Sequence, residues 1–354
     1  MLFDQSLGGN VLTLLESFLI GRFKHVAVGD ACSSDVEVTS GVPQGSVLGP
    51  LLFLIHINFL PSYIRNNCKI FADDLKLYLK IRSVSIASLA IGVTSCQRDI
   101  DRIVLVAKSW GLAFNESKCV AMRLHRRNLE WDELGAINRY YMNGKEITLV
   151  SSHKDLGVIV DSSLRFHIHI RSIAAKAAGM VSNFLRSTIC RSRSFMTSIF
   201  KTHIRPLLEF ASSLWYTGYL EDVRLLEGIQ RRWTRQIEGI EHLPYNERLA
   251  ILDLYSINGR LLRADLILYW KIFNGHSSIL PEDLFTLDTR PGNRGHRFKV
   301  QHLFAITEAR RRSFSFRCIK EWNALPDSVV SSSSLTSFKS GLHKSLGTKL
   351  FEYP

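Results

Sequence analysis

Apolar residues recur at helical spacing along several parts of the chain. Between Asn10 and Arg22 they occupy positions 11, 12, 15, 18 and 19, and Gly21 supplies a stop signal, so a helix is expected there. A second stripe steps by four, three, four and three residues from Cys96 to Trp110 and stops at Gly111. From Ile168 to Gly275 the pattern is helical almost throughout, with Pro206 as an expected kink.

Short alternating runs separate these helices and predict hairpins. The runs 25–28 and 36–38 are joined across Gly29-Asp30. The runs 68–71 and 75–78 flank the tripeptide Ala72-Asp73-Asp74, and Asn143-Gly144 is a signal for a tight two-residue turn. The first helices and hairpins therefore form a mixed α and β region, and the chain beyond it is mainly helical.

Pro43-Gln44-Gly45-Ser46 forms a turn before a run, 51–55, that is apolar nearly all round. Ser46 can cap the helix that follows, and we expect that helix to be buried. Its first amides and Gly45 would lie at an accessible end, where a phosphate or a base pair can approach closely. Taken alone, the turn is equally consistent with a structural role.

The neighbouring carboxylates of Asp73 and Asp74 are the chain's clearest candidate metal ligands. Two adjacent carboxylates repel each other, which favours protonation of one of them unless a cation lies between them and an approaching anion. Hard oxygen ligands of this kind suit Mg²⁺, with Mn²⁺ as an alternative. A polar hairpin tip with two solvated aspartates is the simpler interpretation of the pair alone.

Charge and composition narrow the class of protein. The chain has 354 residues, enough for two or three domains, and a net charge of +13. Residues 171–236 hold eleven Lys/Arg against four Asp/Glu, and residues 290–320 hold nine against one, which suggests a polyanionic partner or ordinary solvated helix faces. The six cysteines form no C-x-x-C pair, and no apolar run reaches the length of a membrane span. We therefore expect an intracellular protein of the nucleus or cytoplasm, without a membrane partner.

Two motifs together resemble the reverse transcriptases of non-LTR retrotransposons, closest to the jockey-like and chicken-repeat-like elements. They are Ser40-Gly41-Val42-Pro43-Gln44-Gly45-Ser46-Val47-Leu48-Gly49-Pro50-Leu51-Leu52-Phe53 and Phe71-Ala72-Asp73-Asp74. The resemblance implies that Asp73 and Asp74 hold the catalytic metals and that Gln44 and Gly45 line the nascent base pair. It also implies an RNA template, a DNA primer and deoxynucleoside triphosphates as partners.

The resemblance continues over nearly the whole chain. The segment 112–119 is similar to the family's motif beside the nucleotide, where Lys118 is a candidate for protonating the pyrophosphate, or else a plain surface lysine. The segment 153–158, with Lys154, looks like the strand that holds the primer end. Basic groups able to track a nucleic-acid backbone follow on the helical part and on the C-terminal segment: Arg231, Arg232, Arg235, Arg310, Arg311 and Arg312. The segment 292–297 continues that basic surface.

These observations predict an α+β fold, a partial right-hand polymerase palm with an antiparallel sheet packed by helices, followed by a mainly helical thumb and a C-terminal extension. The expected boundaries are 1–125 for the partial palm, 126–167 for the hairpin and primer-grip-like segment, 168–280 for the thumb and 281–354 for the basic extension. His167 and His169 could share a strand face and bind metal, although two surface histidines are the simpler interpretation.

The family supplies a third catalytic aspartate from an earlier palm strand, and nothing before Ser40 fits that motif. Phe3-Asp4 is superficially similar, but Gly8-Gly9-Asn10-Val11 matches the part of the family that follows it. Two hypotheses remain. The chain is the C-terminal part of a reverse transcriptase, weak or inactive as an isolated polypeptide, or it is a noncatalytic retrotransposon remnant that binds nucleic acid.

Overall fold

The computed structural model describes residues 9–81, 85–124, 139–288, 290 and 295–353. The chain divides into two compact units, Met1–Ala121 with Glu130–Leu149 (unit 1) and Met122–Leu129 with Val150–Pro354 (unit 2). The described residues form a mixture of helices and strands, as the sequence predicted. The finer division into four domains stays a prediction. Among the described residues, no helix is both long and apolar enough to cross a membrane.

The described part of unit 1 combines three α-helices, of which α3 is the longest, with short strand pairs. Its elements, in chain order, are α1 (Asn10–Leu19), β1 (Arg22–Lys24), β2 (Ala27–Val28), β3 (Ala31–Cys32), β4 (Val36–Val38), α2 (Leu48–Ile57), η2 (Leu60–Tyr63), β5 (Asn67–Phe71), β6 (Asp74–Tyr78), α3 (Ile86–Ser109), η3 (Glu116–Lys118), β7 (Val120–Met122), β8 (Tyr141–Met142), β9 (Lys145–Glu146) and β10 (Thr148–Val150). The described strands pair only two by two, as β1–β4, β2–β3, β5–β6, β8–β9 and β7–β10.

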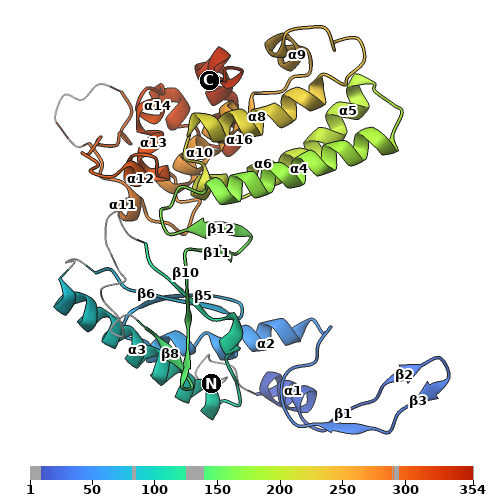
Figure 1. Cartoon of the computed structure of the whole chain (residues 1–354), viewed down its shortest axis with the longest axis vertical. Helices are drawn as coiled ribbons and strands as arrows, with labels where there is room; N and C mark the ends of the chain where they lie inside the picture. Colours follow the sequence, from blue (N-terminus) through green and yellow to red (C-terminus); the bar gives the residue numbers. More distant parts are fainter. Residues whose placement is uncertain (1–8, 82–84, 125–138, 289, 291–294, 354) are drawn as a thin grey trace. The chain divides into compact units, whose positions relative to one another are not determined.

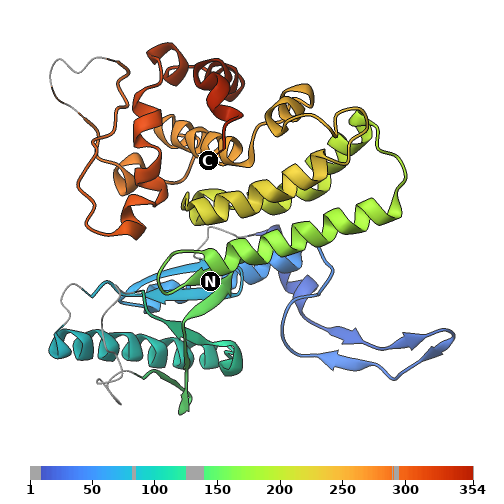
Figure 2. The same cartoon turned by 45° about the horizontal axis from the view of Figure 1, so that its top comes forward.

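One face of the β5–β6 hairpin is apolar and packs into a core. The antiparallel register pairs Phe71 with Asp74 and Ile70 with Leu75. Because side chains alternate along a strand, Ile70 and Leu75 share one face, where they pack with Ile57 of α2 and Ile103 of α3. Helices α2 and α3 thus cover the apolar face of the hairpin, and the arm formed by β1–β4 and β2–β3 extends away from this core (Figures 1 and 2).

The hairpin expected from the runs 25–28 and 36–38 was wrong in its pairing, because β2 pairs with β3 across Gly29-Asp30 and β4 pairs with β1. Three other turn signals of unit 1 are confirmed. Helix α1 ends at Leu19 before Gly21, whose φ is +67°. Helix α3 ends in a Schellman motif in which Gly111, with φ +70°, donates its N–H to the Lys108 carbonyl at 3.1 Å. Asn143 and Gly144 both have positive φ in the predicted β8–β9 turn.

The expectation that the helix after the glycine turn is buried was wrong for one of its faces. In α2, Leu52 and Ile57 are buried, but Leu51 is 53% exposed and Leu54 38% exposed. The helix is apolar all round, yet the core formed with α3 and the hairpin touches only one side of it. The apolar pattern therefore predicted the helix correctly and its environment only in part.

Unit 2 is mainly helical, as predicted. It contains β11 (Ser152–Asp155), β12 (Val158–Asp161), α4 (His167–Ser187), α5 (Arg193–Ile199), η5 (Phe200–Ile204), α6 (Arg205–Glu209), α7 (Ser212–Trp215), α8 (Leu220–Thr234), α9 (Tyr245–Ile251), α10 (Ile257–Phe273), α11 (Pro281–Leu284), α12 (Glu308–Arg311), α13 (Phe314–Arg317), α14 (Ile319–Asn323), α15 (Asp327–Val330), α16 (Leu335–Leu346) and η6 (Gly347–Leu350).

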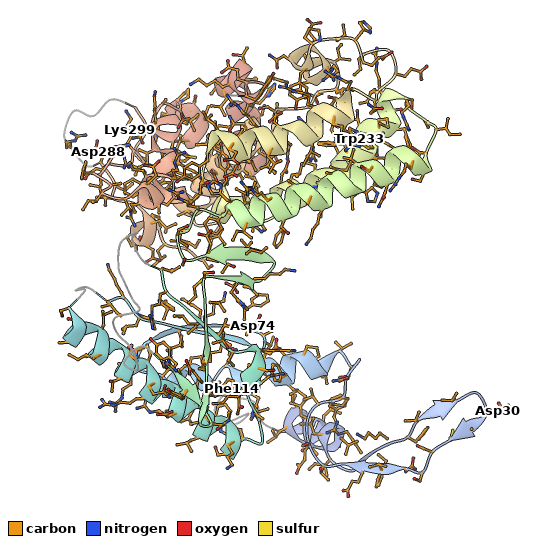
Figure 3. All side chains as sticks on the ribbon, in the orientation of Figure 1. Asp30, Asp74, Phe114, Trp233, Asp288 and Lys299 are labelled. Carbon is orange, nitrogen blue, oxygen red and sulfur yellow. The ribbon has the colours of Figure 1, made fainter. Side chains whose placement is uncertain are left out.

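Two apolar cores hold unit 2 together. The first joins α4, α5, α8 and the start of α10, with Trp215 and Trp233 almost fully buried in it. The second surrounds the rest of α10 with α13 to α16 and contains Trp270 and Trp322. Helices α4 and α8 lie side by side, and Trp233 of α8 is directed into the helical layer (Figures 1 and 3). No break occurs at Pro206: helical turns run without interruption from Arg193 to Glu209 as α5, η5 and α6, and the π-helical turn η5 precedes Pro206.

Candidate functional site: an acidic hairpin and a glycine turn

Asp73 and Asp74 lie where β5 turns into β6. The turn consists of Ala72, with φ +51°, and Asp73, while Asp74 is the first residue of β6. The sequence placed both aspartates at the tip, whereas the structure places Asp74 in the strand, opposite Phe71 (Figure 3). Both side chains are exposed.

The carboxylates of Asp73 and Asp74 can accept a ligand without first losing a protein partner. Within the described ranges, neither carboxylate takes part in a hydrogen bond or an ion pair. Two exposed carboxylates fit a hard divalent cation by the chemistry of their donor atoms. No group of three or more potential metal ligands occurs in the part of the chain that the structure describes. The hairpin therefore supplies two oxygen-donor side chains.

Hydrogen bonds between neighbouring residues hold the glycine turn in its conformation. Gly45 has φ +83°, a conformation that side-chain-bearing residues rarely adopt. The hydroxyl of Ser46 donates to the Pro43 carbonyl at 2.7 Å and accepts from the Gly49 N–H at 3.0 Å, so Ser46 caps α2 as predicted. A Cβ on Gly49 would lie 2.7 Å from the Pro43 carbonyl oxygen. Both glycines are therefore required by the backbone, and Gln44 and Gly45 stay exposed at the end of α2.

Lys118 lies at the end of η3 and is exposed. Glu116, at the other end of this short helix, accepts a hydrogen bond from Asn143 Nδ2 at 2.6 Å, which ties η3 to the β8–β9 turn. Phe114, just before η3, packs into the same core as the β5–β6 hairpin. Lys118 thus belongs to unit 1, as do Gln44, Gly45, Asp73 and Asp74, and the roles of all five stay predictions.

Asp99 is a structural residue that the sequence analysis missed. It lies on α3 and is 1% exposed, and its carboxylate accepts hydrogen bonds from the Asn66 N–H at 2.8 Å, the Asn66 Nδ2 at 2.7 Å and the Arg65 N–H at 3.1 Å. Arg102 Nη1 also forms an ion pair with Asp99 Oδ1 at 2.7 Å. Burial alone would raise the pKa of Asp99, but these hydrogen bonds outweigh it and lower the pKa. Asp99 fixes the start of β5 and so positions the acidic hairpin.

The arginines predicted to bind nucleic acid fall into two groups. Arg231 and Arg312 are half-buried: the Arg231 guanidinium lies 4.7 Å from the Tyr353 ring, and the Arg312 guanidinium lies 4.0 Å from the Tyr219 ring. The others are exposed, namely Arg232, Arg235, Arg310 and Arg311. Arg231 and Arg312 therefore hold parts of unit 2 together. Three of the exposed four also have contacts: Arg232 donates to the Ser182 hydroxyl, the Arg310 guanidinium lies over the Phe316 ring, and Arg311 forms an ion pair with Glu308.

Two further expectations changed in unit 2. The segment 153–158, expected as one strand, forms part of the β11–β12 hairpin, and Lys154 lies exposed on β11. His167 and His169 begin α4 instead of sharing a strand face. His167 Nδ1 lies 2.6 Å from Asp222 Oδ2, and His169 is 2% exposed. Burial lowers the pKa of His169, so it is a core histidine and not a surface residue. Residues 292–294 of the predicted basic segment lie outside the described residues.

Part of the chain is similar to a known protein family. Residues 7–159 match the family described as reverse transcriptase (RNA-dependent DNA polymerase), and this region includes the glycine turn and the acidic hairpin. Residues 7–159 are therefore similar to a reverse transcriptase domain, in agreement with the resemblance of the sequence motifs.

Curated relatives of the chain include polymerases of mobile elements, in agreement with the sequence motifs. The chain is 28% identical over 255 residues to a probable RNA-directed DNA polymerase from transposon X-element of Drosophila melanogaster, covering 69% of this chain and 27% of the relative. It is 24% identical over 237 residues to the RNA-directed DNA polymerase from mobile element jockey of the same species, covering 64% and 25%. The chain thus spans about a quarter of the length of these curated relatives.

Proposed function

We propose that this chain provides part of the catalytic apparatus of a non-LTR retrotransposon reverse transcriptase. The reaction is attack of a primer 3′-hydroxyl on the α-phosphate of a deoxynucleoside triphosphate, directed by an RNA template, with release of pyrophosphate. The observation that carries the proposal is the exposed Asp73-Asp74 pair, free of protein partners in the described chain, within a region that matches the reverse transcriptase family. Unit 1 would act as the palm, and the helices of unit 2 as the thumb.

The carboxylates of Asp73 and Asp74 would bind Mg²⁺, or Mn²⁺ in its place. A bound divalent cation neutralises charge on the reacting phosphate and lowers the pKa of the attacking hydroxyl. Gly45 leaves room for the base pair to approach the backbone, because it carries no Cβ. Lys118 would donate a proton to the pyrophosphate, and Gln44 would line the nascent base pair.

The exposed basic groups of unit 2 would contact the template and the primer. Arg232, Arg235, Arg310 and Arg311 can reach phosphates from the surface, and Lys154 can do so from the β11–β12 hairpin. Arg231 and Arg312 would support that surface through their contacts with aromatic rings. Contacts of this kind give affinity that falls steeply with salt.

Primer extension on an RNA template tests the proposal. We expect weak Mg²⁺-dependent incorporation by the unmodified chain, and its loss in Asp73→Asn and Asp74→Asn, since a metal ligand supplies several kcal/mol of transition-state stabilisation. Asp30→Asn is the matched control, because Asp30 is an exposed aspartate in the β2–β3 turn of the same unit (Figure 3). No incorporation together with salt-sensitive RNA binding would contradict the enzymatic proposal and favour a noncatalytic nucleic-acid-binding protein.

A further inference from the structure

The segment between β-bridge residue Val300 and helix α12 turns its large apolar side chains toward solvent. Phe304 is 91% exposed, Ile306 70% and Leu303 43%. Ala305, the smallest apolar residue of the segment, packs instead against the second core of unit 2. A loop folded only to fill the core would bury its large side chains and expose the small one, so core packing does not explain this arrangement.

Both ends of the segment are fixed. Before it, Asn323 exchanges two hydrogen bonds with the backbone of Val300, at 2.8 and 2.9 Å, and the Gln301 N–H donates to the Thr286 carbonyl at 2.8 Å. After it, the Thr307 hydroxyl accepts the Arg310 N–H at 3.2 Å and caps α12. Contacts on both sides of the segment therefore hold Phe304 in its exposed position.

The sequence on either side of the segment is rich in basic residues. Residues 290–320 hold nine Lys/Arg and one acidic residue, Glu308. Arg310 and Arg311 are exposed, with the Arg310 guanidinium 4.6 Å from the Phe316 ring centroid and Arg311 Nη2 3.2 Å from Glu308 Oε2. The six residue steps from Phe304 to Arg310 span at most about 20 Å even when extended. An apolar protein surface would gain little from these arginines. A single-stranded nucleic acid satisfies both features, because its bases stack on aromatic rings and its phosphates attract arginine.

We propose that residues 302–306, with Arg310 and Arg311, form a binding site for single-stranded nucleic acid in which Phe304 stacks on a base. The Leu303 and Ile306 side chains flank the stacked base, and the two arginines contact the neighbouring phosphates. This inference rests on the nucleic-acid-binding part of the proposed function. It does not depend on chemistry at Asp73 and Asp74, which lie in the other unit.

Binding of short fluorescent oligo(dT) and oligo(rU) to the full chain, measured by anisotropy, tests the inference and separates DNA from RNA. Phe304→Ala should weaken binding about tenfold, since stacking on one aromatic ring contributes about that factor or more. Phe304→Tyr keeps the ring and should bind within about twofold of the unmodified chain. An oligomer of abasic sites has the same phosphates without bases, so it should bind the unmodified chain and Phe304→Ala equally weakly.

Ile189→Ala is the matched control, because Ile189 is 97% exposed, apolar and located between α4 and α5 of the same unit. It should leave binding unchanged. Arg310→Gln and Arg311→Gln should each reduce the slope of log K against log salt by about 0.7. The inference is overturned if Phe304→Ala binds like the unmodified chain, if Phe304→Tyr is as weak as Phe304→Ala, or if abasic strands bind as tightly as normal ones.

Primer extension on the same samples separates this inference from the proposed polymerase. If no incorporation occurs but binding still depends on Phe304, the polymerase proposal is contradicted and the stacking site is supported. Incorporation that requires Asp73, with binding indifferent to Phe304, contradicts the stacking site alone.

Discussion

The acidic hairpin of unit 1 and two buried carboxylates of unit 2 lie in contrasting environments. In unit 2, Asp265 is fully buried and receives two hydrogen bonds from Arg317, at 2.8 and 2.9 Å, while the buried Glu227 is hydrogen-bonded to Tyr245. In unit 1 the adjacent Asp73 and Asp74 are exposed, without a partner in the described chain. Carboxylates that stabilise a fold are paired and desolvated, whereas carboxylates that can take up a cation are left accessible.

The apolar cores of the two units differ in the side chains that they bury. Unit 2 buries Trp215, Trp233, Trp270 and Trp322 at 1% exposure or less. In unit 1 the core between α2, α3 and the β5–β6 hairpin rests on Ile57, Leu60 and Ile103, and one face of α2 stays exposed. We therefore expect substitutions in unit 2 to act mainly on stability and substitutions at the acidic hairpin to act mainly on chemistry.

Asp265→Ala should give the largest loss of stability. Its removal leaves the Arg317 guanidinium, whose side chain is 9% exposed, buried without a counter-ion, which costs about 3–5 kcal/mol of the free energy of unfolding. Urea unfolding followed by tryptophan fluorescence measures this loss. Glu238→Ala, which removes an exposed carboxylate of the same unit, should change the value by less than about 0.5 kcal/mol. Equal effects of the two substitutions would contradict the contrast drawn above.

Two glycine substitutions in unit 2 should act with opposite signs. A Cβ on Gly259 of α10 would lie 2.2 Å from the Leu350 carbonyl oxygen, so Gly259→Ala should destabilise by about 2 kcal/mol or more. A Cβ on Gly228 of α8 meets nothing within 4 Å, so Gly228→Ala should stabilise by up to about 1 kcal/mol. Thermal unfolding of the two variants compares them. A neutral Gly259→Ala would mean that the C-terminal turn does not pack closely on α10.

The contributions of Asp99 in unit 1 and Glu227 in unit 2 to the free energy of unfolding should depend on pH in opposite ways. The pKa of Asp99 is lowered, so its contribution to stability is present above about pH 3.8 and lost as the pH falls through the lowered pKa. Burial raises the pKa of Glu227, so its contribution is present below about pH 4.5 and lost as the pH rises through the raised pKa. Asp99→Asn should reduce the pH dependence of the free energy of unfolding below about pH 3.8. Glu227→Gln should reduce that dependence above about pH 4.5. The reverse pattern would contradict both assignments.

Local sequence signals were sufficient for most of the elements. The helix ends at Gly21 and Gly111, the Asn143-Gly144 turn and the acidic hairpin all depend on residues within a few positions of one another. Their backbone conformations are set by glycine and turn chemistry, which a single sequence displays directly. For the same reason the glycine turn that precedes α2 could be predicted from its own residues.

Long-range contacts could not be read from the sequence. Asp99 binds the backbone of Asn66, 33 residues earlier, and Arg312 donates to the Thr217 carbonyl, 95 residues away. No local pattern distinguishes such an arginine from an exposed one, or the buried His169 from a surface histidine. The exposure of Phe304 was equally hidden, because an apolar residue in a loop is expected to pack inward.

The central claim is that the acidic hairpin carries chemistry and contributes little to stability. Incorporation on an RNA template and the free energy of unfolding, measured together on Asp73→Asn, test it most directly. We expect incorporation to fall to background while the free energy of unfolding stays within about 0.5 kcal/mol of the unmodified chain, because Asp73 is exposed and unpaired in the described chain. Retained incorporation, or a loss of activity matched by a loss of stability, would contradict the claim.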